Sequence, residues 1–236
     1  MRKYWYLLVC MFFMYSATGQ ETDAADLFHK IRSRLDVVKD YTADVKMKID
    51  VAFMRVPLLQ GKLYFKAPDK LKLERDGGIS ILPKKNISLT ANSLIPDGGV
   101  TVIDAGYDTI QGRRTHIIKV VPDDDGNEIV LTRVWVDEGR LLPLRTETTT
   151  RDNGTVKMEL EYGKYIHLSL PDRITFYLDV KEYKLPKGVT MDYDNGDAAM
   201  KKVANGKHKK GKIQITYLDY KVNTGLPDAI FAEKTK

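Results

Sequence analysis

The sequence predicts a mainly β (α+β) fold, in which one antiparallel sheet follows a single amphipathic helix. Three observations lead to this prediction. An unusually long strand with strict alternation of apolar and polar residues covers about residues 42–53. Further segments with a period of two follow it, separated by turn-forming residues. The clearest helical pattern lies immediately before the long strand. Many strands after one helix favour a single sheet over repeated βαβ units.

The long strand is the element on which the prediction depends most. Asp44, Lys46, Lys48 and Asp50 alternate with apolar residues. The apolar side chains of this strand are Ala43, Val45, Met47, Ile49, Val51 and Phe53. A period of two places all of them on one face. A strand of roughly 13 residues, against a typical length of about 5–6, favours a strongly curved sheet or a barrel wall.

The same apolar face continues through two further strands, which predicts an antiparallel meander. Residues 55–57 interrupt the alternation, and Ala67-Pro68-Asp69 has the composition of a turn. The apolar residues that continue the face are Leu59, Leu63, Phe65, Leu71 and Leu73. A continuous apolar surface of this kind has to be covered by another element.

The segment before the meander has the pattern of an amphipathic helix. Thr22 or Asp23 can cap it, and the pattern extends to about Asp40. Its apolar stripe consists of Leu27, Phe28, Ile31, Leu35 and Val38. Because an amphipathic helix buries its apolar stripe, we expect it to cover the apolar face of the meander.

The alternation weakens between residues 77 and 112. Two short strands are predicted there, at 79–82 and 100–103, and we expect a mobile segment near the mouth of any cavity. Regular strands return afterwards, with an Asn153-Gly154 turn pair in the second of two hairpins. These strands are predicted at 115–121, 129–136, 142–150, 155–162, 174–180 and 213–222.

Residues 20–236 are predicted to form a single domain, within which residues 184–211 form a loop insertion rich in Lys, Gly, Asp and Asn. The lysines between 201 and 212 favour a solvated loop. Contact with an anionic membrane surface is the alternative for them.

Residues 1–19 have the pattern of a secretory signal peptide, with cleavage expected near residue 19. Arg2 and Lys3 precede the apolar run 4–15, and small residues follow it. The run is short for a membrane span, so an uncleaved anchor is the less favoured interpretation. Cys10, the single cysteine, lies in this run. An exported chain without cysteine suits the bacterial periplasm better than a eukaryotic extracellular space.

The sequence shows no constellation typical of catalysis or metal binding. The histidines are His29, His116, His167 and His208, without metal-type spacing, and each is interpreted as structural or solvated. Motifs of serine hydrolases, dinucleotide sites and phosphate loops are absent. Removal of Arg2 and Lys3 lowers the formal net charge from +6 to +4, which is too mild to indicate nucleic acid. We therefore expect no enzyme activity, cofactor, metal site or nucleic-acid partner.

The apolar face itself suggests a function. If helix and sheet do not close completely, they leave a dry cavity in which an acyl chain gains about 0.8 kcal/mol per buried methylene. The simpler alternative is that helix and sheet pack together as an ordinary core.

Several stretches resemble one known family. The helix runs directly into the long strand, and residues 61–68 (Gly-Lys-Leu-Tyr-Phe-Lys-Ala-Pro) are similar to a Gly-x-Leu-aromatic-x-Lys-x-Pro run. Residues 134–137, together with Leu142-Pro143 and Gly154, resemble a paired-strand segment, and residues 220–231 resemble a C-terminal closure. These features resemble the LolA/LolB-like superfamily of periplasmic lipoprotein carriers, which includes outer-membrane lipoprotein-sorting proteins.

The resemblance implies an open antiparallel half-barrel, covered by the N-terminal amphipathic helix, with a hydrophobic cavity for acyl chains. The residues expected to line this cavity are Val45, Met47, Ile49, Val51, Phe53, Leu63, Phe65, Leu71 and Leu73. The residues expected to form its lid are Leu27, Ile31 and Leu35. Carriers of the family have a latching arginine just before the meander proline, where this chain has Ala67. This departure favours a carrier without that latch, or one for a different lipid.

The function implied is that of a non-enzymatic periplasmic carrier or chaperone for the acyl chains of lipoproteins or lipids. It would deliver them to the outer membrane, with transfer partners at the inner and outer membranes. The alternative is a sensor or regulatory module of the same fold that docks a protein partner and has a fully packed interior. A hydrolase is a third, less favoured possibility.

Overall fold

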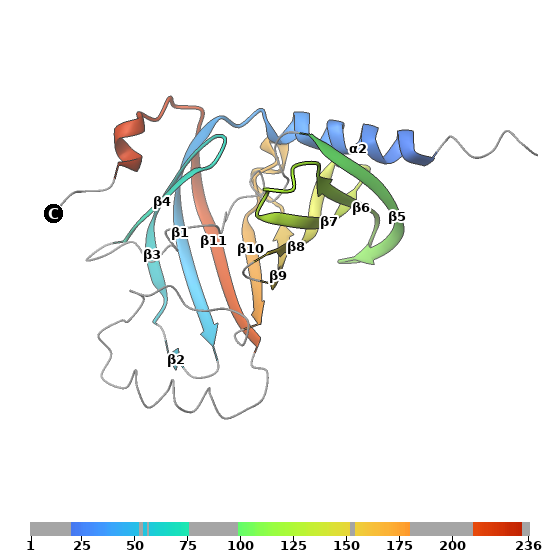
Figure 1. The fold of residues 1–236 in the computed structure, drawn as a ribbon. Coiled ribbons are helices and arrows are strands. Elements are labelled where there is room, and N and C mark those ends of the chain that lie inside the picture. The colour runs from blue at the N-terminus through green and yellow to red at the C-terminus, as the bar shows by residue number, and fades with distance from the viewer. Residues whose placement is uncertain are drawn as a thin grey trace, which may run out of the picture.

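The computed structural model describes residues 20–51, 54–55, 57–75, 99–151, 154–179 and 210–232. They form one antiparallel sheet with a helix lying across it (Figure 1). The described elements are α2 (Gln20–Leu35), β1 (Asp40–Val51), β2 (Met54–Arg55), β3 (Leu59–Lys66), β4 (Lys70–Arg75), β5 (Val100–Ile110), β6 (Arg113–Pro122), β7 (Ile129–Asp137), β8 (Leu142–Thr150), β9 (Gly154–Glu161), η2 (Ile166–Leu168), β10 (Arg173–Asp179), β11 (Lys210–Val222) and η3 (Asp228–Phe231). The predicted signal peptide and most of the predicted insertion lie outside these residues. Among the described helices, none has the length and apolar character needed to cross a membrane.

The strand order is β4-β3-β1-β11-β10-β9-β8-β7-β6-β5, and β2 pairs with the end of β1. The predicted meander is confirmed as β1-β3-β4, and the two predicted hairpins as β6-β7 and β8-β9. The last strand pairs with the first, from Tyr41 opposite Val222 to Asp50 opposite Lys212. Within the described residues, the end strands β4 and β5 do not pair with each other, so the barrel is open.

The sheet bends strongly, which brings its two ends to different sides of α2. In Figure 1 helix α2 lies above β6 to β9 with β5 beside it, whereas β1, β3 and β4 lie to its left. The helix therefore covers mainly the β5–β9 half of the sheet, instead of the meander that it was expected to cover. The expected open half-barrel covered by a helix is therefore confirmed.

The ends of two N-terminal elements differ from the prediction. Helix α2 already includes Thr22 and Asp23, so neither is the N-cap, and it ends at Leu35 instead of continuing to Asp40. The first strand starts at Asp40, two residues before the predicted start. Val38 lies beyond the end of the helix and is buried, which explains why an apolar residue at this position fitted the predicted stripe.

The strand predicted at 100–103 is present, but its predicted end was wrong, because β5 extends from Val100 to Ile110. The pairing of β5 with β6 shifts between Asp104 and Tyr107. Gly106 takes a positive φ of 82° there, and its N–H donates to Asp104 Oδ1 at 2.6 Å. Because this bulge interrupts the period of two, the second half of the strand does not continue the alternation of its first half.

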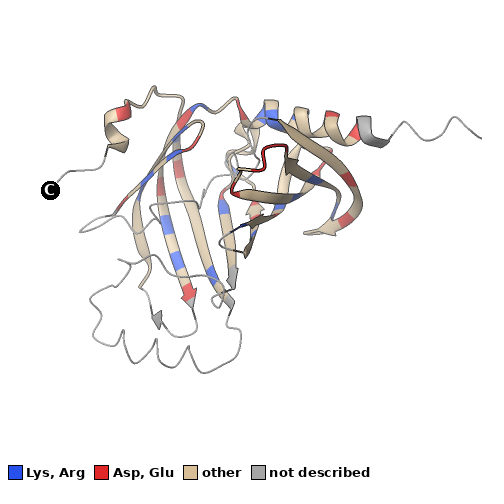
Figure 2. Cartoon of the chain, viewed as in Figure 1, with Lys and Arg blue, Asp and Glu red and all other residues tan. Residues whose placement is uncertain are grey.

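The outer face of the sheet is polar and contains many ion pairs. Figure 2 marks Lys, Arg, Asp and Glu residues along β1 and its neighbours, so both signs of charge occur on these strands. Arg145 donates to Glu159 at 2.8 Å, and Lys157 lies 2.9 Å from the same carboxylate. Tyr177 also donates to Glu159, at 2.9 Å. Such cross-strand pairs mark this side of β8, β9 and β10 as the solvent-facing side.

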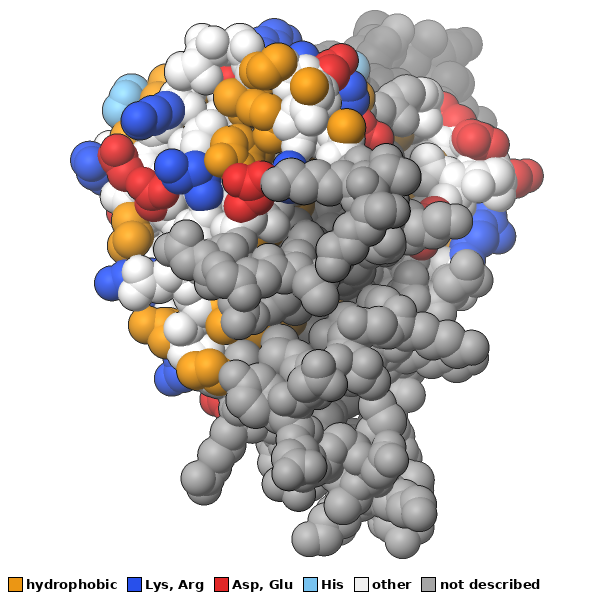
Figure 3. Space-filling model, turned by 90° about the vertical axis from the view of Figure 1, so that its left-hand side faces the viewer, with side chains coloured by type: hydrophobic (Ala, Val, Ile, Leu, Met, Phe, Trp, Pro, Cys, Tyr) orange, Lys and Arg blue, Asp and Glu red, His pale blue; other side chains and the backbone are white. Residues whose placement is uncertain are grey.

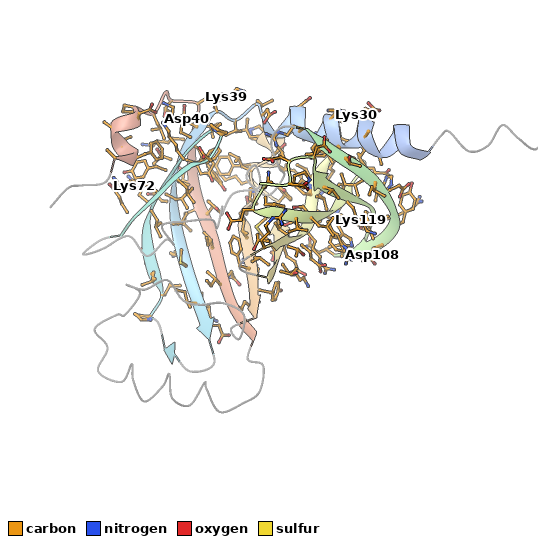
Figure 4. The ribbon with its side chains drawn as sticks, viewed as in Figure 1. Lys30, Lys39, Asp40, Lys72, Asp108 and Lys119 are labelled. Atoms are coloured by element: carbon orange, nitrogen blue, oxygen red, sulfur yellow. The ribbon has the colours of Figure 1, made fainter. Side chains whose placement is uncertain are left out.

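A smaller apolar cluster also lies on the outer face, away from α2. It consists of Ile110, Trp135 and Leu144. The Trp135 indole donates to Asp108 Oδ2 at 3.0 Å, and Figure 4 labels Asp108 near β5. The Asp108 pKa lies below its ordinary value, mainly because the Thr109 N–H donates to the carboxylate and secondarily because of Trp135.

The C-terminal segment is fastened to the start of β1 by a buried carboxylate. Asp40 is 5% exposed and accepts hydrogen bonds from the backbone N–H groups of Thr224, at 2.8 Å, and Gly225, at 3.0 Å. Figure 4 shows Asp40 at the upper end of β1. Because both donors belong to the backbone after β11, Asp40 fixes the path by which the chain leaves the sheet.

Beyond this point, η3 packs beside the edge strand β4. Lys72 donates to the Ile230 carbonyl at 2.6 Å, and Lys66 donates to Asp228 at 2.6 Å. Lys70 lies 3.1 Å from the other Asp228 oxygen. Figure 3, which views the molecule from this side, shows hydrophobic side chains gathered near the top with charged ones below them. The lysine contacts tie the C-terminal segment to β3 and β4.

This attachment should weaken at acidic pH. Hydrogen bonds from Lys66 and then Lys70 hold the Asp228 pKa below its ordinary value. A carboxyl with a lowered folded-state pKa contributes above its ordinary value of about 4 and loses that contribution as the pH falls through the folded value. We expect the NMR signals of residues 229–232 to shift below about pH 4, without global unfolding. An Asp228→Asn variant should resemble the acid form at neutral pH, and an identical titration in both proteins would contradict this assignment.

Candidate functional site

The inner face of the sheet is a continuous apolar surface formed by strands from both ends of the chain. The register pairs Met47 with Leu59 on one side and with Ile215 on the other. Ile215 in turn pairs with Ile174, and Ile174 with Leu160. Because directly paired residues point to the same side of a sheet, one surface extends from β3 across β1, β11 and β10 to β9. We call it the inner face.

Most of the predicted cavity residues lie on this face. Those that are buried are Val45, Met47, Leu63, Phe65 and Leu73, and Ile49 and Leu71 are partly buried against the same cluster. Val51 belongs to β1, but its side chain is not described, and Phe53 lies outside the described residues. The structure thus brings seven of the nine together on three adjacent strands.

The three predicted lid residues point into the same cluster. Leu27, Ile31 and Leu35 are at most 6% exposed, and Ala24 and Phe28 of α2 are buried with them. Side chains at these spacings lie on one stripe of a helix, which explains why α2 lies across the sheet.

Helix α2 also has a polar attachment to the sheet. Arg34 Nε donates to the Ser169 hydroxyl at 2.9 Å, across 135 residues of sequence. Ser169 ends η2 with a positive φ of 59° and is 2% exposed. The contact fixes the C-terminal turn of α2 to the segment that leads into β10.

An aromatic cluster that no sequence pattern indicated lies at the upper end of the inner face. The Tyr41 ring lies 5.1 Å from Phe65 and 5.2 Å from Tyr220, between ring centroids. Tyr220 also contacts Tyr165 at 5.0 Å and stacks on Tyr217 at 5.1 Å. We call these five residues the aromatic cluster. Tyr41 precedes the predicted start of the first strand, so the alternation used for that strand did not include it on this face.

A β-bulge places two of these tyrosines on the same side of β11. The pairing with β1 shifts so that Asp44 opposes Asp219 whereas Val45 opposes Tyr217, which leaves Leu218 as the extra residue. Residues three apart in a regular strand point to opposite faces. The bulge reverses this for Tyr217 and Tyr220, and Leu218 is left 45% exposed.

The hydroxyl groups of the tyrosines on this side of the core differ in their partners. Tyr220 donates to the Pro171 carbonyl at 2.8 Å, Tyr162 donates to the Pro143 carbonyl at 3.0 Å, and Tyr165 donates to Asp219. The Tyr217 hydroxyl is buried and has no hydrogen-bond partner among the described residues. Burial is the main cause that raises the pKa of Tyr217 far above its ordinary value, and the neighbouring Tyr41 acts in the opposite direction.

One histidine occupies an unexpected position. His116 on β6 is 1% exposed, with Nδ1 2.9 Å from Glu138 and Nε2 3.2 Å from Asp104. Tyr107 stacks on its ring at 4.6 Å, and Arg114 lies over Tyr107. The Gly106 N–H is the main cause that lowers the Asp104 pKa, and His116 acts in the same direction. These contacts fasten β5 to β6. Across the described part of the chain, no group of three or more metal-ligating side chains is arranged to hold a metal ion.

The chain was compared with known proteins. No family model matches it, and the search of curated proteins also found no match. Solved structures do match. A domain from Vibrio parahaemolyticus that is named for outer membrane lipoprotein sorting has 12% identity and a TM-score of 0.54, over 89% of this chain and 97% of that one. A DUF1329 family protein from Desulfovibrio piger has 13% identity and a TM-score of 0.53, over 91% and 98%.

A LolA superfamily protein from Nitrosomonas europaea matches with 12% identity and a TM-score of 0.50, over 87% of this chain and 97% of that one. The chain has the LolA-like fold. At these identities the comparison establishes the fold alone. Within this LolA-like fold, Ala67 lies between β3 and β4, and Arg34 of α2 supplies the arginine contact between helix and sheet described above.

Proposed function

We propose that this chain is a non-enzymatic carrier that holds the acyl chains of lipoproteins or other lipids against the inner face. The observation that supports it best is that predicted wall residues of β1, β3 and β4 and predicted lid residues of α2 belong to one continuous apolar cluster. The LolA-like fold supports the same function, since one protein that shares it is named for outer membrane lipoprotein sorting.

The mechanism would be exchange of contacts instead of covalent chemistry. An acyl chain entering beneath α2 replaces helix side chains such as Ile31 against the inner face. Each methylene buried in this way contributes about 0.8 kcal/mol, so a chain of 16 carbons compensates for a large part of the lid contacts. The tethers of α2 that such an exchange would have to break include its apolar stripe and the Arg34–Ser169 hydrogen bond.

The proposed location is the bacterial periplasm, after export and cleavage near residue 19. The proposed partners are an inner-membrane donor and an outer-membrane acceptor of the lipid. Native mass spectrometry of the protein from a periplasmic fraction, followed by lipid extraction, tests location and cargo together. A co-purifying acylated species is expected. A protein that carries no lipid and also ignores added fluorescent fatty acid would contradict the carrier and favour the partner-docking alternative.

A substitution on the inner face tests the binding surface. Ile49 is partly buried on the inner face of β1, and the adjacent Lys48 is exposed on the outer face. Ile49→Glu should weaken uptake of a fluorescent fatty acid by about ten-fold or more, because a carboxylate in an apolar wall is costly to desolvate. Lys48→Glu changes charge on the same strand and should leave uptake unchanged. Circular dichroism should show a folded sheet in both, and equal uptake by both would argue against this surface.

A further inference from the structure

The buried hydroxyl of Tyr217 is a polar group in an otherwise apolar wall. Its side chain is 5% exposed, and no described group forms a hydrogen bond with the hydroxyl. Buried polar groups in folded proteins are almost always hydrogen-bonded, so an unpaired hydroxyl calls for an explanation. A phenylalanine would fill the same space in this wall without leaving a donor unpaired.

The other hydroxyls of the region do not offer a partner. Those of Tyr162, Tyr165 and Tyr220 already donate to Pro143, Asp219 and Pro171. The Tyr41 hydroxyl is a polar neighbour whose hydrogen-bonding interaction lowers the Tyr217 pKa, but the contact falls short of good hydrogen-bond geometry and leaves the Tyr217 hydroxyl unsatisfied. The strand partner Val45 and the same-face neighbour Ile215 are apolar and supply no acceptor or donor to this hydroxyl.

The position of Tyr217 suits the polar end of a bound lipid. It lies on the inner face opposite Val45, which is one of the proposed wall residues. From this point the apolar surface continues along β1 and β11 through Met47, Ile49 and Ile213. An extended acyl chain laid along these strands would place its first polar atom beside the hydroxyl. The bulge at Leu218 turns Tyr217 to this side next to Tyr220.

We propose that Tyr217 donates a hydrogen bond to the carbonyl oxygen of an uncharged fatty ester bound on the inner face. This inference rests on the carrier function proposed above and specifies its ligand. A protonated phenol is a good donor to a carbonyl, and burial raises the pKa of Tyr217 and so keeps it protonated. A free carboxylate would require a cation, and the inner-face neighbours Ala43, Val45 and Ile215 carry none.

The test compares two ligands that differ in the ester alone. Methyl palmitate and hexadecane would each displace a fluorescent fatty probe from the wild-type protein and from Tyr217→Phe. We expect Tyr217→Phe to bind methyl palmitate about ten-fold more weakly and hexadecane equally well, since one lost hydrogen bond corresponds to about a ten-fold change. Tyr64→Phe, whose hydroxyl donates to Glu74 on the outer side of the sheet at 3.1 Å, is the matched control and should leave both ligands unchanged.

The outcomes separate this inference from the proposed function. If neither ligand displaces the probe from wild type, the carrier function itself fails, and the inference with it. If both bind and Tyr217→Phe affects them equally or not at all, the inference is overturned while the carrier remains. Thermal unfolding of the lipid-free proteins is a second readout. Tyr217→Phe should be at least as stable as wild type, because it removes an unpaired hydroxyl, and a clearly less stable variant would show that the hydroxyl has a structural partner.

Discussion

Replacing Phe65 by alanine should lower the free energy of unfolding by about 3–5 kcal/mol. Phe65 is 1% exposed near the C-terminal end of β3, and its ring lies 5.1 Å from that of Tyr41. Tyr41 then contacts Tyr220 at 5.2 Å on β11, so Phe65 supports a row of rings across three strands. Alanine removes the buried ring and leaves a cavity that the fixed strands cannot close. Urea denaturation followed by circular dichroism measures the loss.

The neighbouring Tyr64 offers the matched control for this prediction. Tyr64 is half-buried on the outer side of the same strand, and its hydroxyl contacts Glu74 there. Tyr64→Phe should change the free energy of unfolding by no more than about 0.5 kcal/mol, as is typical of surface substitutions. If Phe65→Ala costs less than about 1 kcal/mol, the aromatic cluster does not form the tightly packed end of the core that its burial indicates.

The parts of the fold that the sequence predicted well are those governed by local periodicity. The alternation from Ala43 to Ile49 depends on neighbouring residues alone, and it correctly identified the face that β1 buries. The same is true of Leu63 and Phe65 on β3, because their hairpin is closed by a short turn. Local pattern also found the stripe of α2, from Leu27 to Leu35.

The errors lie where tertiary structure alters the local pattern. The bulge near Gly106 reverses the alternation within β5, so a strand of 11 residues was predicted as a short one. Val38 is buried after the end of α2 and was therefore counted as part of the helix. The pairing of β1 with β11 joins residues far apart in sequence, such as Tyr41 and Val222, and no local signal encodes it.

The candidate site likewise has features that local periodicity predicts and features that depend on tertiary structure. The apolar wall could be predicted, because each of its strands has an apolar face of its own. The buried hydroxyl of Tyr217 could not, since it depends on the bulge at Leu218 and on where the hydroxyls of Tyr162, Tyr165 and Tyr220 find acceptors. The contact between Arg34 and Ser169 could not be predicted from sequence either, because it connects a helix to a turn 135 residues away. The hydrogen-bond partner of a buried polar group depends on the assembled fold, whereas the apolar face of a strand depends on the alternation within that strand.

Gly61, the glycine of the 61–68 stretch, lies too close to a neighbouring strand to carry a side chain. Its replacement should therefore have the second large effect on stability. Gly61 on β3 pairs with Val45 on β1 and with Arg75 on β4. A Cβ at this position would overlap the backbone carbonyl oxygen of Glu74 and lie 3.4 Å from Leu73 Cδ1. Because the first obstacle is backbone, it cannot rotate away, and relief requires β3 and β4 to separate. Gly61→Ala should therefore cost about 1–3 kcal/mol, the usual range for overpacking, in urea denaturation.

Gly139 provides the control, since it has an ordinary φ and a Cβ there would meet Asp137 Oδ1 at 3.5 Å, a normal van der Waals distance. Gly139→Ala should change stability by less than about 0.5 kcal/mol. A second readout separates strain at the sheet edge from general loss of stability. Amide exchange in β4 should accelerate in Gly61→Ala more than exchange in β7 or β8, because the overlap lies between β3 and β4 alone. Uniform acceleration, or a variant as stable as wild type, would mean that the close approach of Gly61 to Glu74 is not what requires a glycine in this stretch.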